Sequence, residues 1–326
     1  MVTKFIRSIP DGYVMLAYYS EFQKKNTFKP REDDIWIVTF LRSGTTWTQE
    51  LTWCIVNIDE IEDARKFPLW FRTPFYEWDC LVPPDGLPDL SQLAIPFDTI
   101  EEADKHFQKH GNMVPHLESL PSPRVIKTHL PISLLPPEVR KNKIIYVSRN
   151  PKDSGISYYS LFHTFDSFMG TLDDFIEQSI HGISLWGPHW KHVREHWEMR
   201  NEPNVCFLTF ESLCYDFHIG KLKAPRSGFA FTATNPHRQN AIEEIERLAR
   251  FLGKDLTQEQ TKAVEEEASI ERMREKSPVT ESNYRWKHLN PSRDTAESFI
   301  RGGRVGGWRN VLDEDQVEKI DKYIRE

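Results

Sequence analysis

The sequence lacks any apolar segment long enough to cross a membrane. No run in its 326 residues approaches the roughly 18 apolar residues that a transmembrane helix needs. The apolar patch YVMLAYY near the N-terminus is shorter than that. It follows a stretch interrupted by Pro10, Asp11 and Gly12, which does not fit a secretory signal. We therefore expect a soluble protein of the cytoplasm.

Cysteine is scarce, and the cysteines present do not form a recognisable metal or redox motif. The four residues are Cys54, Cys80, Cys206 and Cys214, with no CxxC pair and no nearby histidine at zinc-ligand spacing. Cys54 and Cys206 lie in apolar runs, as buried thiols do. This usage suits a reducing compartment, and the sequence predicts no metal site.

An excess of basic residues is also missing. The formal net charge is -7 and the sequence pI is about 6.0, which argues against nucleic acid as a partner. An anionic ligand must therefore be met by a local basic pocket. Aromatic residues, by contrast, make up 12% of the chain and include ten Trp. They indicate either ordinary core packing or a site for a flat or lipophilic ligand.

Short apolar runs rich in β-branched residues alternate with runs of helical spacing. Apolar residues recur at helical spacing from Trp47 to Ile58 and from Ile242 to Leu252, and Gly253 ends the second of these stripes. This alternation predicts one α/β domain over residues 1–326, with a central parallel β-sheet flanked by helices. In such sheets ligands lie beyond the carboxyl ends of the strands. The predicted strands are residues 35–40, 124–128, 143–148 and 205–210.

Two segments do not fit these regular layers. Residues 67–78, FPLWFRTPFYEW, combine six aromatic residues with two prolines and are predicted to form a loop over the site. Residues 217–238 are basic and punctuated by Gly and Pro, so we expect an exposed, inserted loop there.

The first strand leads into a turn that is typical of an anion site. In residues 40–47, FLRSGTTW, the small residues Ser43 and Gly44 precede a predicted helix start, whose free N–H groups and dipole attract phosphate. An ordinary capped helix would use the same residue types. The pattern GxxxxGK[ST] is absent, and the cation, Arg42, comes before the glycine. A nucleotide triphosphatase is therefore disfavoured.

The next two strand ends also carry polar residues. His129, with Lys127 nearby, is a candidate general base, although a structural histidine would explain it equally well. Arg149 and Ser157 could hold a second phosphate, or be a surface arginine and a helix residue. Near the C-terminus, FIRGGRVGGWRN interleaves glycines with Arg301 and Arg304, a composition suited to wrapping a ligand.

Taken together, these stretches resemble the cytosolic sulfotransferase family in order and spacing. Residues 40–47 are similar to the family motif YPKSGTTW, KTHLP is intact at 127–131, and RNPKD-x-x-x-SYY is intact at 149–159. RGGRVGGWRN, at 301–310, resembles RKGxxGDWKN in altered form, and HVREHWE is also like the family. The resemblance covers nearly the whole chain.

The resemblance implies that the donor is 3′-phosphoadenosine 5′-phosphosulfate (PAPS), with the product PAP, bound at a P-loop-like turn. His129 would be the general base, Arg42 would stabilise the leaving phosphate oxygen, and Lys127 would steady the sulfuryl oxygens. No metal is implied. The implied cofactor contacts are Arg42, Ser43, Gly44, Thr45, Thr46, Trp47, Arg149, Ser157, Phe210, Ser269, Met273, Phe299, Arg301, Gly302 and Gly303.

The acceptor is expected to be a small lipophilic molecule with a hydroxyl group, such as a phenol, a steroid or another alcohol. Besides Lys127 and His129, its pocket would be walled by Phe22, Phe75, Tyr76 and Phe162. Three alternatives remain open: net dehydration of an allylic alcohol through its sulfate, a nucleotide-binding protein with little catalysis, and phosphoryl transfer.

Several positions depart from the family pattern. Arg42 stands in place of lysine, Phe210 in place of tyrosine, and Gly302 in place of a lysine that binds the 3′-phosphate, so weaker donor binding is expected. The family's dimerisation motif is poorly kept, which leaves a homodimer open as an assembly. Arg309, Asp313, Glu314 and Glu318 fall at its positions.

Overall fold

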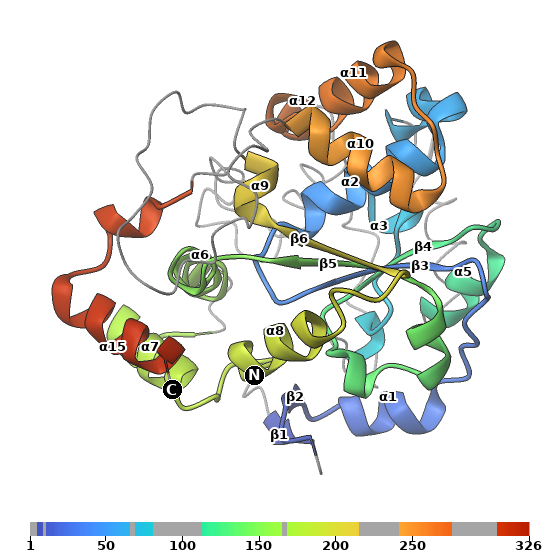
Figure 1. Ribbon diagram of the computed structural model, residues 1–326. Helices are drawn as coiled ribbons and strands as arrows, with labels where there is room; N and C mark the ends of the chain where they lie inside the picture. Colours follow the sequence, from blue (N-terminus) through green and yellow to red (C-terminus); the bar gives the residue numbers. More distant parts are fainter. Residues whose placement is uncertain are drawn as a thin grey trace.

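A four-stranded, all-parallel sheet forms the centre of the computed structural model (Figure 1). The structure describes residues 5–8, 11–65, 69–80, 113–164, 168–214, 241–275 and 305–325. The strand order is β4-β3-β5-β6. Their bounds are β3 Ile35–Thr39, β4 Val125–Thr128, β5 Lys143–Ser148 and β6 Val205–Thr209. The predicted α/β fold with a central parallel sheet is confirmed.

Helices cover both faces of this sheet. Those that precede β5 are α1 Tyr19–Lys25, α2 Thr45–Val56, α3 Leu69–Arg72 and α5 Met113–Ser119, with the 3₁₀ helices η1 Ile58–Arg65, η2 Trp78–Cys80, η4 Ile132–Leu134 and η5 Pro137–Lys141. Those between β5 and β6 are α6 Pro151–Thr164, α7 Leu172–Ile180 and α8 His189–Glu198.

After β6 come α9 Phe210–Cys214, α10 Ala241–Leu252, α11 Gln258–Glu267, α12 Ile270–Glu275, η6 Gly307–Asn310 and α15 Glu314–Arg325. A small antiparallel pair, β1 Phe5–Arg7 and β2 Val14–Leu16, lies apart from the central sheet.

Successive side chains of each strand point to opposite faces of the sheet, so the core has two layers. Ile35 and Ile37 of β3 pack in a cluster with residues of α2, α10 and α11, whereas Trp36 and Val38 pack in a second cluster on the other face. Trp36, Ile37 and Val38 have no exposed surface. Figure 1 shows α2, α10 and α11 on one side of the sheet and α1 and α8 on the other. Burial on both faces explains why these strands are almost continuously apolar.

The predicted element boundaries were off by one residue at several places. β5 has the predicted bounds, but Phe40 and Phe210 lie beyond β3 and β6, and Arg124 precedes β4. Phe210 instead begins the short helix α9. Phe40 and Phe210 extend the apolar runs because they pack in the core next to the strands, not because they join the ladder.

The loop predicted over residues 67–78 is partly wrong. Its described part contains the helical turn α3, and Phe75 forms a parallel bridge with Lys127 at the edge of the sheet. Gln49 of α2 donates to the Thr73 carbonyl at 3.1 Å and so ties this segment to the domain. The prediction for residues 217–238 lies outside the described residues.

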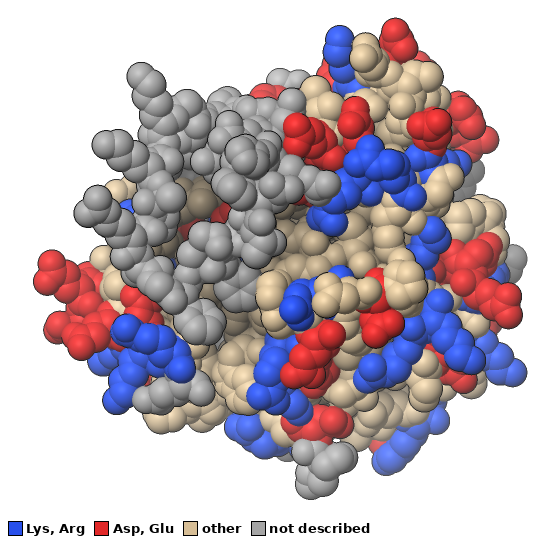
Figure 2. All heavy atoms as spheres, in the orientation of Figure 1, with Lys and Arg blue, Asp and Glu red and all other residues tan. Residues whose placement is uncertain are grey.

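On the face drawn in Figure 2, basic and acidic side chains are interspersed across the described part of the chain. A helix that could span a membrane is not found among the residues that the structure describes.

A buried ion pair fixes the start of β3 against the start of β4. Arg124 Nη2 lies 2.6 Å from Asp34 Oδ2, and the two side chains are 1% and 0% exposed. Arg124 also donates to the carbonyls of Leu117 and Lys29, so its charge is fully enclosed by acceptors.

Replacing Asp34 with Ala should destabilise the protein by about 3–5 kcal/mol, because it leaves a buried arginine without its counter-charge. Urea unfolding followed by circular dichroism measures the change. Glu21→Ala, which removes a solvent-exposed partner of Lys24, is the matched control and should leave the midpoint unchanged. Equal midpoints for Asp34→Ala and the wild type would contradict this account.

Candidate active site

The carboxyl ends of the four strands bring together residues that are far apart in the sequence. In the register, Val38 lies opposite Thr128, Thr39 opposite Val147, and Ser148 opposite Thr209. The residues that follow these positions therefore meet at one edge of the sheet. They include Arg42, His129, Arg149 and Phe210, as the sequence predicted.

The turn between β3 and α2 has the geometry of an anion site. Arg42 and Gly44 both have left-handed backbones, with φ of 64° and 103°, and Gly44 is the N-cap of α2, whose first turn holds no acidic residue. A Cβ on Gly44 would lie 2.6 Å from the ring of Phe210, so the close approach here requires glycine. The positive end of the α2 dipole at this turn favours an anion.

Ser43 supplies a donor at this turn. Its side chain is 0% exposed, and its hydroxyl has no hydrogen-bond partner among the described residues. A buried hydroxyl without a partner is costly, which a phosphate oxygen would correct. The orphaned hydroxyl and the glycine approach fit a phosphate-bearing group. Thr45 is buried and Thr46 is half-buried in the same helical turn.

The two predicted phosphate sites are directly connected. Arg42 Nε donates to Ser157 Oγ of α6 at 2.9 Å, and Arg149 Nη1 donates to the Arg42 carbonyl at 2.9 Å. The guanidinium of Arg149 also lies 4.0 Å from the centroid of the Phe210 ring. Arg42, predicted at the phosphosulfate, therefore also contacts Ser157, predicted at the 3′-phosphate.

The residues predicted beside the adenine are also gathered in one place. Trp47, Phe210 and Met273 belong to the same buried cluster, and the rings of Trp47 and Phe210 are 6.2 Å apart at 76°. Ser269 lies just before α12 and accepts from the Arg272 N–H at 3.2 Å.

The predictions for Phe299, Arg301, Gly302 and Gly303 lie outside the described residues. Just after them, the backbone N–H groups of Gly306 and Trp308 donate to Asp153 of α6 at 2.7 and 3.0 Å. Asp153 belongs to the first turn of the helix that follows Arg149. The C-terminal segment is thus anchored beside the Arg149 side of the site.

The ring of His129 is oriented by the backbone of β3. His129 Nδ1 lies 2.9 Å from the Thr39 carbonyl, which can only accept, so Nδ1 carries the proton and Nε2 of the neutral ring has a free lone pair. The Thr39 hydroxyl lies 3.2 Å from the same nitrogen and 2.6 Å from the hydroxyl of Thr45. Burial, and then the positive charge of Lys127, hold the pKa of His129 well below its usual value. The imidazole is therefore neutral at pH 7, as a base must be.

Lys127 lies beside an aromatic ring, and the charge of a buried glutamate acts on it. Its ammonium lies 4.3 Å from the centroid of Phe75. Burial lowers the pKa of Lys127 to about 8, while the charge of Glu77 opposes that shift. Glu77 is itself 0% exposed, and burial raises its pKa to about 7.

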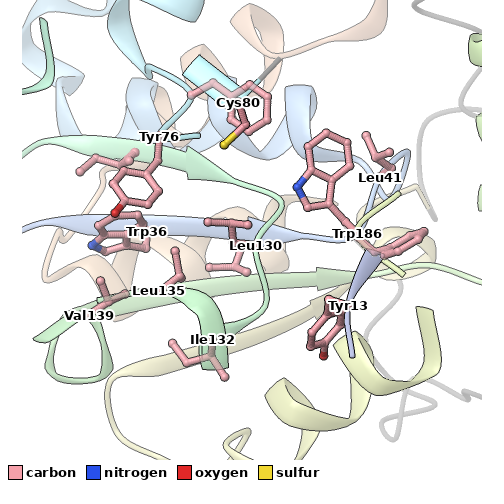
Figure 3. Close-up of a cluster of buried hydrophobic side chains, with 14 of the residues drawn as sticks. Tyr13, Trp36, Leu41, Tyr76, Cys80, Leu130, Ile132, Leu135, Val139 and Trp186 are labelled. Carbon is pink, nitrogen blue, oxygen red and sulfur yellow. The ribbon is translucent and has the colours of Figure 1, made fainter. Parts of the chain in front are cut away.

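The predicted acceptor residues divide into two groups. Phe75 packs edge-on against the His129 ring, with centroids 5.2 Å apart. Phe22 and Tyr76 pack on each other at 5.4 Å, and Tyr76 also packs on Trp36. Figure 3 shows Tyr76 beside Trp36.

Phe162 of α6 contacts the ring of Tyr158 at 4.6 Å. Of the four predicted acceptor residues, Phe75 therefore has the contact that places it beside the proposed base.

Three residues of the site escaped sequence reasoning. Thr39 lies inside the predicted strand 35–40 and Glu77 inside the aromatic segment 67–78, and neither was predicted to be a site residue. Trp186, whose ring centroid lies 5.4 Å from that of His129, has a left-handed backbone with φ of 60°. Figure 3 shows Trp186 next to Leu41. The only sequence signal for Trp186 was its place before Gly187-Pro188, a turn ahead of a helix.

Comparison with known proteins agrees with this geometry. The sulfotransferase domain family matches residues 32–219 and 231–326. Rat sulfotransferase 1A1 is 28% identical over 317 residues, 96% of this chain and 90% of that protein. Rat sulfotransferase 1C2 is 29% identical over 327 residues, 99% and 91% of the two chains.

Solved structures give the same result. Retinol dehydratase in complex with retinol and PAP has a TM-score of 0.77 and 27% identity, and the alignment covers 99% of this chain and 89% of the other. The same enzyme with androsterone and PAP has a TM-score of 0.76 and 26% identity over 99% and 89% of the chains.

The fold and the site define an enzyme of the sulfuryl-transfer class, and the chain belongs to the sulfotransferase family. The resemblance found in the sequence is thereby confirmed, as are the enzyme class and PAPS as the donor cofactor. The orphaned Ser43 hydroxyl, the Gly44 approach and the α2 N-terminus fit the phosphosulfate end of that donor.

The pKa of Lys127 predicts a pH limit on activity. Because this pKa is lowered from 10.5 to about 8, the lysine loses its charge as the pH rises through about 8, and transfer should fall over that range. Arginine stays charged, so Lys127→Arg should lose this alkaline fall even if its rate at pH 7 is reduced by the different shape of the guanidinium. Profiles of kcat from pH 6 to pH 10 measure the effect. Identical alkaline limbs in both enzymes would show that Lys127 is not the titrating group.

Proposed function

We propose that the protein transfers the sulfuryl group of PAPS to the hydroxyl of a small lipophilic acceptor, with His129 as the general base. The observation that carries this proposal is the hydrogen bond from His129 Nδ1–H to the Thr39 carbonyl. It leaves the unprotonated Nε2 for the acceptor hydroxyl, and the lowered pKa keeps the ring neutral.

The residues have separable roles in this mechanism. His129 Nε2 removes the acceptor proton as the acceptor oxygen bonds to sulfur and the bond from sulfur to the phosphate oxygen breaks. When bound, PAPS supplies an activated sulfuryl group. Arg42 and the N–H groups at the start of α2 meet the negative charge of the phosphate that leaves. Lys127 is placed to steady the sulfuryl oxygens.

The remaining donor contacts are proposed from the same geometry. Arg149 and Ser157 would hold the 3′-phosphate, and Trp47, Phe210, Ser269 and Met273 would surround the adenine. Their support is that Arg149 and Ser157 both bond to Arg42, and that Trp47, Phe210 and Met273 share one buried cluster.

The acceptor is proposed to be a phenol, a steroid or another lipophilic alcohol. Phe75 and Trp186 flank His129 with apolar rings, which suits a molecule that is apolar around its hydroxyl. Phe22, Tyr76 and Phe162 would extend this wall, since they pack in or against the same cluster as Phe75.

A location in the cytoplasm is proposed as well. The described cysteines are all free, and three of them are buried thiols, which suits a reducing compartment.

Replacing His129 with Ala should lower sulfate transfer by about 10²–10⁴-fold, the usual contribution of a general base. Affinity for PAP should be unchanged, because His129 is on the acceptor side of the site. Transfer of labelled sulfate over a panel of phenols, steroids and catecholamines, with calorimetry of PAP binding, measures both quantities.

The exposed His181, 69% of whose side chain is accessible, provides the control variant His181→Ala, which should behave as the wild type. Retained turnover in His129→Ala would rule out its role as the base. Binding of PAP by the wild type without turnover of any acceptor would instead favour a nucleotide-binding protein with little catalysis.

A second candidate function is net dehydration of an allylic alcohol. It is favoured by the likeness to retinol dehydratase, whose TM-score of 0.77 exceeds the 0.60 of a mouse sulfotransferase. In this reaction the alcohol is first sulfated. The sulfate ion then leaves with the electrons of the C–O bond, and loss of a carbon-bound proton forms a new double bond.

Mass analysis of the product separates the two functions. With retinol as the acceptor, a dehydratase gives a hydrocarbon lighter than retinol by one water, together with free sulfate. A sulfotransferase acting on a phenol gives a stable sulfate ester. We expect the ester with phenols, because a phenol cannot eliminate sulfate in this way. A sulfate ester as the sole product from retinol would exclude the dehydratase function.

A further inference from the structure

Two buried side chains form hydrogen bonds with the backbone of His129, one at its N–H and one at its carbonyl. Its N–H donates to Glu77 Oε1 at 2.6 Å, and its carbonyl lies 3.1 Å from Nε2 of His192 in α8. We propose that Glu77 and His192 are positioning residues that form a backbone clamp, which aims the His129 ring at the acceptor. This inference rests on the proposed role of His129 as the base.

On the carbonyl side, the hydrogen bonds define one state of His192. The His129 carbonyl can only accept, so His192 Nε2 carries the proton, and Nδ1 accepts from the Tyr146 hydroxyl at 2.9 Å. Burial lowers the pKa of His192 and raises that of Tyr146, so both groups are neutral. Tyr146, on β5, is 0% exposed, so the group that supports His192 lies in the core.

On the amide side, Glu77 holds two consecutive residues at the end of β4. One carboxylate oxygen accepts from the His129 N–H, and the other accepts from the Thr128 hydroxyl at 2.7 Å. The Thr128 oxygen in turn accepts from the Leu130 N–H at 3.0 Å. β4 is an edge strand of the central sheet, so among the described residues no further strand lies beside its end. The Glu77 carboxylate supplies acceptors there instead.

The clamp matters because the polar contacts that the structure describes for the His129 ring are all made at Nδ1, to the carbonyl and the hydroxyl of Thr39. Nδ1–H reaches the Thr39 carbonyl, while Phe75 and Trp186 lie near the ring as apolar neighbours. A shift of the His129 backbone would move Nε2 off its line to the acceptor hydroxyl. Displacements of about 1 Å at a reacting group can cost on the order of 10²-fold in rate.

Two substitutions of His192 separate positioning from general structural support. His192→Leu removes both hydrogen bonds. In His192→Gln the amide nitrogen can reach the place of Nε2 and donate to the His129 carbonyl, but nothing replaces Nδ1 for Tyr146. A positioning role therefore predicts that glutamine restores the rate, while both variants lose the support that Tyr146 provides to stability.

We expect His192→Leu to lower kcat by about 10–100-fold and His192→Gln to recover most of that loss. The KM for PAPS should not change in either variant. His196→Leu is the matched control, since His196 lies one turn further along α8 and bonds to the His192 carbonyl, not to His129. Its kcat should remain near the wild-type value, while its melting temperature falls as in His192→Leu.

For Glu77, the test is Glu77→Gln, which leaves one acceptor oxygen for two donors. Its kcat should fall, with the KM for PAPS unchanged. Asp79→Asn is the control, because Asp79 is a half-buried carboxyl in the same segment that accepts from Met113 N and does not bond to His129.

The ring itself gives a readout that does not depend on turnover. With nitrogen-15 histidine and His129 assigned by its loss in His129→Gln, the wild type should show a single tautomer protonated at Nδ1. His192→Leu and Glu77→Gln should show a mixture, and His196→Leu and Asp79→Asn should not. If the wild type shows no transfer but the tautomers change in this way, the clamp stands and the proposed function fails.

Two results would overturn the proposal. One is an unchanged His129 tautomer in both His192→Leu and Glu77→Gln. The other is a rate in His192→Gln no better than in His192→Leu, with losses of kcat that simply follow melting temperature across all variants and controls.

Discussion

The hydrogen bond from His129 to the Thr39 carbonyl joins the two halves of the site. It fixes which ring nitrogen bears the proton, and it does so with a backbone atom of β3, the strand that leads into the donor turn. The Thr39 hydroxyl continues the connection to Thr45 in the first turn of α2. His129 of the proposed acceptor side and Thr45 of the proposed donor turn are therefore both linked to Thr39, the last residue of β3.

Parallel pairing makes this arrangement possible. Because β4 and β5 flank β3 in register, the segments after all three strands emerge on the same side. Arg149 then reaches back to the Arg42 carbonyl, and Arg42 reaches across to Ser157. The donor turn, which contains two left-handed residues, is held in shape by contacts from its neighbours.

Much of this could be predicted from the sequence, since strand runs and turn residues are local signals. The runs that became β3, β4, β5 and β6 are apolar on both faces, and the residues after them are polar, so both the sheet and its functional edge were predictable. Within a contiguous motif such as KTHLP, the spacing between the residues is set by the sequence itself. The boundaries at Phe40 and Phe210 were wrong because core packing continues past the last ladder bond.

The rest depended on tertiary contacts. Glu77 lies 52 positions before His129 and His192 lies 63 after it, and nothing local indicates that both bond to its backbone. Trp186 reaches the site through a left-handed backbone conformation that an unbranched aromatic residue rarely adopts. The aromatic residues and prolines of segment 67–78 predicted a loop. The bridge between Phe75 and Lys127 forms only in the folded sheet, so no local pattern indicated it.

The anchoring of the C-terminal segment on Asp153 makes the start of α6 depend on a distant part of the chain. The N–H groups of Gly306 and Trp308 bond to the two oxygens of this carboxylate from 153 and 155 positions further along the sequence. Asp153 lies in the first turn of α6, the helix that follows Arg149. A chain cut before Gly306 would therefore leave the Asp153 carboxylate without these two donors, beside an otherwise complete sheet.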